Sequence, residues 1–428
     1  MSLISDNKMK LSGLYYQLAS KGFIWAAKLL SPINKRADLL IKSRKKGIEF
    51  PTKKENEIRL WLHVASLGEF EQARPVLQIL KQEIPQLTIF TSFFSPSGYE
   101  NRHQDVLNDF AFYLPFESKK IAASLIHQLN PDFAIWVKYD FWLHYLNELK
   151  NKNIPCFLIA AAFRENQIYF KKQGQNFLKT FKNFEIIACQ NKASSEILNQ
   201  HGLLNHFVSG DPRIDRVIAG KESKNEIPFI SEFKGKQPLL IIGSAYELEI
   251  NLVKNYLLNH PELKCIIAPH FVDEINISKI KKLVSDAILY SELKELNQLN
   301  KQIIIIDSIG KLSSLYQYAD FAFIGGGFKN GGLHNILEAV VYGIPVCFGP
   351  KINKFPEAIQ LSNLKLAEKV ANRNEFELWM DEFQKNRIKV ANRQQKLEDW
   401  MHLNAGAASK TAGRILKSLS SKNIIVSN

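Results

Sequence analysis

From Glu57 onwards, short apolar runs alternate with longer segments in which apolar residues recur at helical spacing. The runs are apolar at nearly every position, as is typical of parallel strands covered by helices on both faces. The predicted strands before residue 215 are Ile58–Ala65, Leu87–Phe93, Phe110–Phe116, Phe133–Tyr139, Pro155–Ala162 and Glu185–Cys189. Those after residue 238 are Leu239–Gly243, Lys264–Ala268, Ala287–Tyr290, Gln302–Asp307, Phe321–Ile324 and Pro345–Phe348. This rhythm predicts an α/β fold.

A polar stretch, roughly Asp215 to Gln237, interrupts the rhythm and has the composition of a linker. A chain of 428 residues is also too long for one ordinary core. We therefore expect two Rossmann-like, doubly wound domains that face each other across a cleft. The predicted boundaries are 1–54 for a basic amphipathic segment, 55–215 and 238–400 for the two domains, 216–237 for the linker and 401–428 for a C-terminal tail.

The last part of the chain, from Asn372, is polar with a helical pattern, and we expect Trp379, Phe383, Trp400 and Met401 to anchor it. Hydrophobic content of 46% and 23% charged residues indicate an ordinary globular protein. The four cysteines lie in apolar runs without C-x-x-C spacing: Cys156, Cys189, Cys265 and Cys347. We predict that they are buried thiols of a reducing compartment, not disulfides or metal ligands.

The first 54 residues are strongly basic, with twelve Lys or Arg against three acids, which accounts for +9 of the net charge of +14. One helical face there is apolar: Leu11, Leu14, Tyr15, Leu18, Gly22, Trp25 and Leu29. The opposite face carries Lys10, Gln17, Lys21 and Lys28. Two lysines interrupt the apolar run, so we predict a helix lying in a membrane interface instead of spanning it. The alternative is a surface helix packed on the protein's own core. No signal-peptide pattern is present.

A glycine-rich loop follows the predicted strand Phe321–Ile324, with Gly325, Gly326, Gly327, Gly331 and Gly332 leading into a predicted helix at His334–Val341. Glycines let backbone N–H groups approach a phosphate, and the N-terminus of a helix favours negative charge. The spacing is not that of the dinucleotide fingerprint, so the loop indicates an anion or nucleotide site only in general terms. Asn335 and Glu338 have an alternative interpretation as a helix-capping box.

A second strand–turn–helix junction lies in the first half, where Ser66, Gly68 and Glu69 follow the first strand. Open α/β sheets bind their ligands at the carboxyl ends of strands. Glu69 would lie in the first turn of the next helix, where it could act as a general base. The alternative is that Glu69 only complements the helix dipole.

Other residues give weaker indications of a functional site. His63, His144, His201, His206 and His334 show no paired metal spacing, and we assign them structural or surface roles. Asp211 and Asp215 do not form an aspartate-x-aspartate metal motif, so no metal requirement is expected. Phe90, Phe93 and Phe94 are interpreted as core residues.

The ordered motifs of the whole chain resemble those of 3-deoxy-D-manno-octulosonic acid (Kdo) transferases. The matching segments are Ser66–Glu69, Thr91–Gly98, Gly210–Asp215, Gly243–Glu249, Ala268–His270, Asp307–Leu312, Gly331–Glu338 and Tyr342–Pro350. The resemblance implies a GT-B glycosyltransferase of two Rossmann-like domains. It also implies an inverting transfer of Kdo from CMP-Kdo to the lipid A precursor, by a peripheral or monotopic protein at the cytoplasmic face of the inner membrane.

The resemblance assigns roles to individual residues. Glu69 matches the family's catalytic base, and Arg213 matches a basic residue that steadies the reacting anionic groups. The matches to the CMP-binding segments are Pro269, His270, Ile309, Gly310, Lys311, Asn335, Ile336, Leu337 and Glu338. Growing negative charge on departing CMP calls for cationic or N–H donors, and Glu338 would accept hydrogen bonds from ribose hydroxyls.

Three segments depart from the family pattern. Lys138 replaces a glutamate that the family uses near the reaction centre, and we keep it as a candidate catalytic residue. His270 stands where the family usually has arginine, and Tyr246-Glu247 replaces a histidine–glutamate pair. These changes affect the details of donor and acceptor contacts.

Two rival interpretations remain. One is a GT-B transferase that uses another activated sugar. The other is a non-enzymatic basic protein that binds membranes or nucleic acid. The basic cluster lies beside the amphipathic segment and not within an aromatic stacking platform, which favours an anionic inner-membrane surface over nucleic acid.

Overall fold

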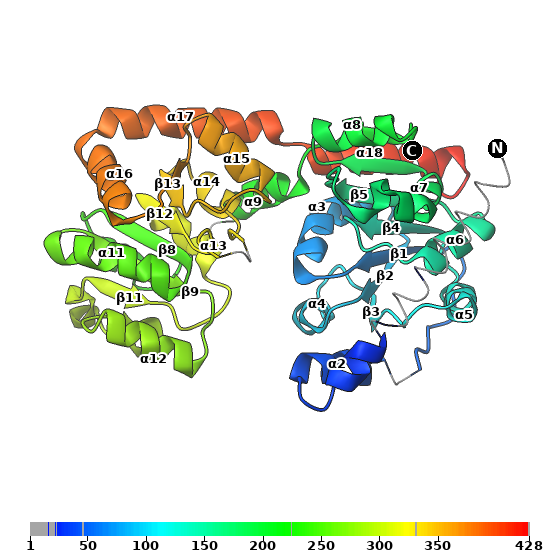
Figure 1. Ribbon diagram of the computed structural model, residues 1–428, viewed down its shortest axis with the longest axis horizontal. Coiled ribbons are helices and arrows are strands. Elements are labelled where there is room, and N and C mark those ends of the chain that lie inside the picture. Colours follow the sequence, from blue (N-terminus) through cyan, green and yellow to red (C-terminus); the bar gives the residue numbers. More distant parts are fainter. Residues whose placement is uncertain are drawn as a thin grey trace. The chain divides into compact units, whose positions relative to one another are not determined.

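The computed structural model describes residues 16, 22, 24–44, 47–223, 225–329 and 332–426 of the chain (Figure 1). The chain forms two compact units. Unit 1 runs to Arg216 and includes the chain from Asn404 onwards, and unit 2 is Val217–Leu403. Each unit contains one seven-stranded sheet, so the predicted α/β fold with two Rossmann-like domains is confirmed.

The sheet of unit 1 is parallel throughout, with strand order β3-β2-β1-β4-β5-β6-β7. Its strands are β1 (Ile58–Val64), β2 (Leu87–Phe93), β3 (Phe110–Tyr113), β4 (Phe133–Val137), β5 (Cys156–Ala161), β6 (Ile186–Cys189) and β7 (His206–Val208). Six of them were predicted. The strand β7 was missed because it has three residues and begins with histidine, so it has no apolar run.

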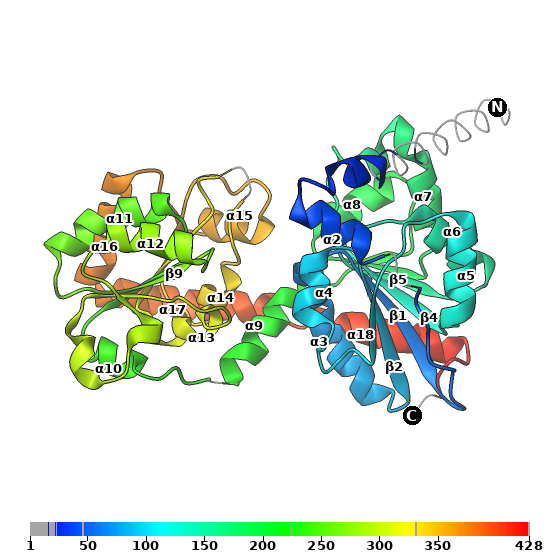
Figure 2. The ribbon, with the colours of Figure 1, turned by 90° about the horizontal axis from the view of Figure 1, so that it is seen from below.

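Helices pack on both faces of this sheet. The helices of unit 1 are α2 (Lys35–Lys42), α3 (Leu67–Glu83), α4 (Pro96–Arg102), α5 (Lys119–Leu129), α6 (Leu143–Asn151), α7 (Gln175–Phe181), α8 (Lys192–Gln200) and α18 (Ala407–Ser421), and α9 (Pro212–Glu222) continues into unit 2. Two short 3₁₀ helices, η1 (Ile168–Phe170) and η2 (Lys172–Gly174), precede α7. Helices α3 and α18 share one core with the sheet, while α5, α6 and α8 bury their apolar residues on the other face (Figure 2).

Unit 2 repeats the architecture with strand order β10-β11-β9-β8-β12-β13-β14, again parallel. Its strands are β8 (Leu239–Ala245), β9 (Lys264–Pro269), β10 (Ile288–Leu289), β11 (Ile303–Ile305), β12 (Phe321–Ile324), β13 (Val346–Phe348) and β14 (Glu368–Lys369). The main helices are α10 (Ile230–Lys234), α11 (Glu247–Asn259), α12 (Glu274–Leu283), α15 (Pro356–Asn363), α16 (Arg373–Lys385) and α17 (Arg387–Asn404). Two short helices, α13 (Leu312–Leu315) and α14 (Leu337–Val340), follow β11 and the glycine loop.

The division of the chain differs from the predicted boundaries. The predicted linker is largely helical, because α9 and α10 occupy much of it. The predicted tail is not separate, because α18 returns to unit 1. Asp215 holds it there by accepting hydrogen bonds from the backbone N–H groups of Gly406 (2.5 Å) and Ala408 (2.8 Å). A carboxylate at the N-terminus of a helix satisfies N–H groups that lack partners within the helix.

Several local predictions are confirmed, and one is wrong in extent. The four cysteines are buried and unpaired by disulfides, and the predicted anchors of the last helices are buried. The helix predicted at His334–Val341 is only α14. Its first residues stay in the loop because the N–H of His334 donates to the carbonyl oxygen of Gly325 (3.2 Å).

Most of the predicted amphipathic face near the N-terminus lies outside the described residues, which retain Gly22, Trp25, Lys28 and Leu29 of the two predicted faces. Residues 24–30 are helical. The side chains of Trp25 and Leu29 are 68% and 69% exposed. Within the described ranges, no helix has the length and apolar character needed to cross a membrane.

Candidate active site at the carboxyl edges of the two sheets

Each sheet reverses its winding at one point, between β1 and β4 in unit 1 and between β8 and β12 in unit 2. At such a switch point the loops after two neighbouring strands run to opposite faces, which leaves a crevice for a ligand. The predicted site residues Glu69 and Lys138 follow β1 and β4. The predicted segment at His270 follows β9, next to β8, and the glycine loop follows β12.

Glu69 lies in the first turn of α3 and is only 8% exposed. One of its carboxylate oxygens accepts a hydrogen bond from the N–H of Ala65 (2.5 Å). Burial raises the pKa of Glu69 to about 7, and the charge of Asp140 acts in the same direction, while the Ala65 N–H and Lys138 oppose both. A carboxylate that only complements a helix dipole would be exposed and its pKa would be lowered. Glu69 is instead poised to gain and lose a proton near neutral pH, as a general base requires.

Lys138 directly follows β4 and adopts a left-handed backbone conformation with φ of 59°. This conformation is unfavourable for a residue with a side chain, by about 1 to 3 kcal/mol, and such strain gathers at functional sites. The N–H of Lys138 donates to the carbonyl oxygen of Ile159 (3.0 Å), which holds the turn in place. The charge of Lys138 acts on Glu69, so these two predicted residues interact electrostatically.

Arg213 is the second residue of α9 and pairs with Asp211 through two guanidinium nitrogens, at 2.9 and 2.6 Å from one carboxylate oxygen. The Asp211 carboxylate therefore offsets part of the charge that the resemblance assigns to anion binding. Asp215, in the same motif, caps α18 as described above. The motif thus has a structural function that the sequence did not reveal.

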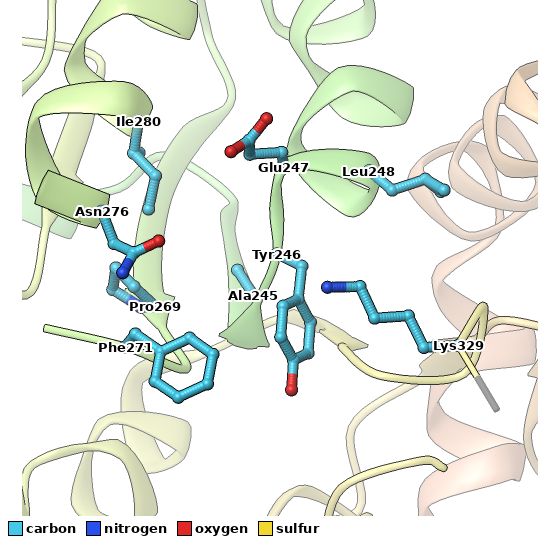
Figure 3. Close-up of a pocket in the computed structure, with 9 residues that line it drawn as sticks. All are labelled: Ala245, Tyr246, Glu247, Leu248, Pro269, Phe271, Asn276, Ile280 and Lys329. Atoms are coloured by element: carbon cyan, nitrogen blue, oxygen red, sulfur yellow. The ribbon is translucent and has the colours of Figure 1, made fainter. Parts of the chain in front are cut away.

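Unit 2 has a cavity of about 360 Å³ at the carboxyl ends of β8 and β9 (Figure 3). Its volume is within the range of small-molecule sites, roughly 300 to 1,000 Å³. The lining residues are Ala245, Tyr246, Glu247, Leu248, Pro269, Phe271, Asn276, Ile280 and Lys329. Of the predicted donor-binding residues, Pro269 lines this cavity.

An aromatic group lies around Tyr246. Its ring is stacked near that of His334 (centroids 5.8 Å apart) and tilted near that of His270 (5.1 Å), and its hydroxyl is 3.2 Å from Nε2 of His334. Burial lowers the pKa of His334 to about 4, with His270 contributing, and burial with Lys329 lowers the pKa of His270. Lys329, with Nζ 3.8 Å from the centroid of the Tyr246 ring, supplies the positive charge of this group (Figure 3).

Buried Glu249 ties the glycine loop to α11. It is 1% exposed, and its carboxylate accepts from the N–H groups of Tyr246 (3.1 Å) and Gly326 (2.8 Å). A Cβ on Gly325 would lie 2.2 Å from the carbonyl oxygen of Ser244, so only glycine fits there. Close backbone packing between the loops after β8 and β12 therefore requires at least this glycine.

In the segment Asn335–Glu338, the helix α14 has Ile336 and not Asn335 at its N-cap. Asn335 Nδ2 donates to Glu338 Oε1 (3.0 Å), and Asn335 Oδ1 accepts from the N–H of Leu337 (3.2 Å). The side chains of Ile336 and Leu337 are fully buried in unit 2, so a ligand could meet only their backbone groups. Asn335 and Glu338 remain the polar candidates of this segment.

The remaining predicted donor segment lies in the loop between β11 and α13. Ile309 is 83% exposed, Gly310 has φ of 90°, and Lys311 Nζ lies 5.4 Å from the centroid of the Tyr290 ring. This loop leaves the same carboxyl edge as the loop after β9, the neighbouring strand. Within the described ranges, no group of three or more His, Cys, Asp or Glu side chains is arranged to hold a metal ion.

Sequence reasoning missed several residues of these two regions. Tyr246 was noted only as a departure from the family pattern, His334 and His63 were assigned structural or surface roles, and Lys329 was not singled out. Asp140 was not proposed, because Lys138, two residues earlier, was the departure from the family pattern that we considered at that point. The sequence held one signal for Tyr246, its place directly after the strand at a switch point.

The two doubly wound domains, with a buried carboxylate at one switch point and a glycine loop at the other, define a protein of the GT-B glycosyltransferase architecture. The fold is similar to that of the UDP-GlcNAc 2-epimerase from Neisseria meningitidis, with a TM-score of 0.59, 13% identity, and coverage of 85% of this chain and 100% of that one. A putative UDP-N-acetylglucosamine 2-epimerase from Listeria monocytogenes gives a TM-score of 0.58 with 15% identity, covering 86% of this chain and 96% of that one. At these identities the likeness concerns the fold alone.

Residues 41–216 match the family described as 3-deoxy-D-manno-octulosonic-acid transferase (kdotransferase). The 3-deoxy-D-manno-octulosonic acid transferase of Chlamydia trachomatis serovar A is 25% identical over 321 residues, covering 72% of this chain and 73% of that protein. Its namesake in Rickettsia bellii is 24% identical, covering 81% of this chain and 87% of that protein. The chain is thus similar to Kdo transferases and is a glycosyltransferase.

Proposed function

We propose that the protein transfers Kdo from CMP-Kdo to the lipid A precursor in lipopolysaccharide core synthesis, with inversion at the anomeric carbon. The observation that carries this proposal is Glu69, a buried carboxylate with a pKa of about 7 at the switch point of unit 1. It lies within the part of the chain that matches the Kdo transferase family.

In the proposed reaction, Glu69 takes the proton from a sugar hydroxyl of the acceptor. The hydroxyl oxygen forms a bond to the anomeric carbon of Kdo while the bond from that carbon to the phosphate oxygen breaks. CMP leaves as a phosphate monoester anion, and the proton stays on Glu69. A positioned base of this kind contributes about 10²- to 10⁴-fold in rate.

Unit 2 supplies the donor contacts in this proposal. Lys329 and the N–H groups of the glycine loop would stabilise the charge that grows on the phosphate, and Glu338 would accept hydrogen bonds from ribose hydroxyls. His270, whose pKa is lowered, would contribute hydrogen bonding without a full charge. These groups can meet the electrostatic demand of the reaction, and we propose that no metal is required.

The decisive experiment supplies the purified protein with CMP-Kdo and the lipid A precursor, and identifies products by mass spectrometry. We expect the acceptor to gain one or more Kdo residues and CMP to be released in equal number. UDP-GlcNAc serves as the comparison donor because the structural neighbours are UDP-GlcNAc epimerases. Transfer from UDP-GlcNAc with none from CMP-Kdo would favour a GT-B transferase with another donor.

We further propose that the N-terminal segment holds the protein at the cytoplasmic face of the inner membrane. Trp25, Leu29, Leu30 and Ile33 are exposed large apolar side chains within nine residues of sequence. The surrounding first 54 residues carry a net charge of +9. An apolar surface next to basic residues suits an anionic lipid interface. Tyr16 of the same segment packs on unit 1 beside Phe177, so the proposal concerns the exposed apolar residues between 25 and 33.

Vesicle flotation across a salt series tests this location. Wild type should float with anionic vesicles at low salt and be only partly released at high salt, since the apolar contribution resists screening. Trp25→Glu should float poorly at every salt concentration. Leu378→Glu, at a position 71% exposed on α16, is the matched control and should behave as wild type. Failure of wild type to float at low salt would exclude the anchor.

A further inference from the structure

A buried chain of hydrogen bonds crosses the centre of the sheet in unit 1 and ends at Asp140. Trp61 Nε1 donates to Ser92 Oγ (2.9 Å), Ser92 Oγ lies 2.9 Å from His63 Nδ1, and His63 Nε2 lies 3.0 Å from Asp140 Oδ2. Trp61, His63 and Ser92 have no exposed surface, whereas the Asp140 side chain is 26% exposed. The chain therefore leads from the core to the carboxyl edge of the sheet.

The direction of these hydrogen bonds follows from their chemistry. The indole N–H of Trp61 can only donate, so the Ser92 oxygen accepts there. The single hydroxyl hydrogen of Ser92 then points either to His63 Nδ1 (2.9 Å) or to the carbonyl oxygen of Leu62 (3.3 Å), and the histidine is nearer. With Nδ1 accepting, His63 carries its proton on Nε2 and donates to Asp140.

A second donor reaches the same carboxylate oxygen. The indole Nε1 of Trp142 lies 3.0 Å from Asp140 Oδ2 and donates to it. Two ring N–H groups from different elements thus converge on one oxygen, which fixes the carboxylate in position. Hydrogen bonds to a charged group are stronger than those between neutral groups.

Asp140 acts on Glu69 through its charge. Burial contributes most to the raised pKa of Glu69, and Asp140 is the charged group that adds to it. Lys138, two residues earlier in the chain, acts in the opposite direction. Tyr169 of η1 also interacts with both carboxylates, and its hydroxyl donates to the carbonyl oxygen of Tyr139 (3.0 Å).

The other elements packed on α3 direct their charges elsewhere. Arg102 of α4 and Arg216 of α9 pair with Glu71 (2.6 and 2.9 Å), and Arg74 of α3 pairs with Asp105. Helix α18 meets α3 with apolar side chains. The charge around Glu69 is therefore set mainly by the residues that follow β4.

We propose that His63 is a positioning residue for the transfer reaction: its Nε2–H fixes the Asp140 carboxylate at the switch point between β1 and β4, which also carries Glu69. The proposal rests on the role of Glu69 given above. It assigns a function to a histidine that the sequence suggested was only structural. Asp140 and Lys138 then act in opposite directions on the pKa of Glu69.

The first test compares Asp140→Asn with Lys138→Met in the pH dependence of kcat/KM. Loss of a neighbouring charge shifts a carboxyl titration by about one pH unit or more. Asp140→Asn should move the acidic limb of the profile to lower pH and reduce the maximum rate. Lys138→Met should move the limb to higher pH. Shifts in the same direction, or no shift in Asp140→Asn, would overturn the proposal.

The second test addresses His63 itself. His63→Leu removes the donor to Asp140, while His63→Gln keeps an amide N–H near the position of Nε2. We expect about a tenfold loss of kcat/KM for the leucine variant and substantial recovery for glutamine. In an Asp140→Asn background, His63→Leu should cost less than about twofold, because coupled residues are not additive. Equal losses in both backgrounds would identify a purely structural role and overturn the proposal.

The third test needs no transfer activity. The pH dependence of stability is measured for the full-length protein with and without Glu69→Gln, and the difference reports the titration of Glu69. Repeating the pair with Asp140→Asn should move the midpoint of this difference to lower pH. A shifted midpoint in a protein that does not transfer Kdo would reject the proposed function and still support the action of Asp140 on Glu69. An unshifted midpoint would show that Asp140 does not act on Glu69, and it would overturn the proposal whatever the enzyme transfers.

Discussion

The two switch points of this molecule have the same topology but opposite chemical character. In unit 1, the loops after β1 and β4 bring together Glu69, Lys138 and Asp140, whose charges act on one another. In unit 2, the loops after β8 and β12 bring together backbone groups, neutral rings and Lys329. The first arrangement shifts the pKa of a buried carboxylate, whereas the second gathers backbone N–H groups and the flat faces of rings.

This contrast shows that the fold fixes where a site lies and leaves its chemistry to a few residues after each strand. Both sheets place their loops at the carboxyl edge in the same way. In unit 1 the carboxylate in the first turn of the helix, Glu69, is buried and has a raised pKa. In unit 2 the corresponding carboxylate, Glu249, is used to fasten the glycine loop.

The largest effect should come from the base of unit 1. Glu69→Gln should lower turnover by about 10²- to 10⁴-fold, because the amide cannot take the proton. Binding of CMP to unit 2 should remain unchanged, as measured by calorimetry. The control is Glu83→Gln at the exposed end of the same helix, which should retain full activity. More than about a tenth of wild-type turnover in Glu69→Gln would remove Glu69 from the role of base.

The same substitution should stabilise the protein at high pH. The pKa of Glu69 in the folded protein, about 7, lies above its ordinary value of 4.5, so folding favours the protonated form. This contribution is complete below pH 4.5 and is lost as pH rises through about 7. At pH 8, the free energy of unfolding of Glu69→Gln should be higher than that of wild type by up to roughly 3 kcal/mol. At pH 5 the difference should be much smaller. Urea unfolding at both pH values measures this, and a difference independent of pH would contradict the raised pKa.

A smaller effect is expected for the donor contact in unit 2. Glu338→Ala should raise the KM for CMP-Kdo, since hydrogen bonds to a charged group contribute roughly 1.5 to 3 kcal/mol, or about 10- to 150-fold. The KM for the acceptor should change little. Glu232→Ala, on the exposed surface of α10, controls for loss of charge. An unchanged donor KM in a folded Glu338→Ala protein would place the ribose elsewhere.

The smallest expected effect is tighter binding of the donor. His270→Arg replaces a side chain whose pKa is lowered with a permanent charge beside the proposed phosphate. A gain of roughly 1 kcal/mol would lower the donor KM about fivefold. His402→Arg, at an exposed position of α17, is the control for net charge. Weaker donor binding in His270→Arg would show that the rings of Tyr246 and His334 need a neutral neighbour.

Much of the fold could be predicted because parallel strands buried on both faces leave continuous apolar runs, as at Leu87–Phe93 and Phe321–Ile324. The strands β7 and β14 could not, because they are short and polar residues occupy them, histidine in β7 and glutamate and lysine in β14. Site residues could be proposed from the sequence where they stand in motifs, as with Glu69. His63 and Asp140 escaped because they are 77 residues apart in sequence and meet only through the pairing of β1 with β4. Hydrogen bonds of this kind depend on strand register, which one sequence does not display.

The return of α18 to unit 1 has a consequence for biosynthesis. The ribosome makes the seven strands of unit 1 first, but their core stays open on one side until residues 407–421 have emerged. Helix α3 then meets α18 only after all of unit 2 has been made. Domains normally fold in the order of their synthesis. Here the first domain is the last to be completed, and a protein truncated before Asn404 would present an uncovered apolar surface to the cell.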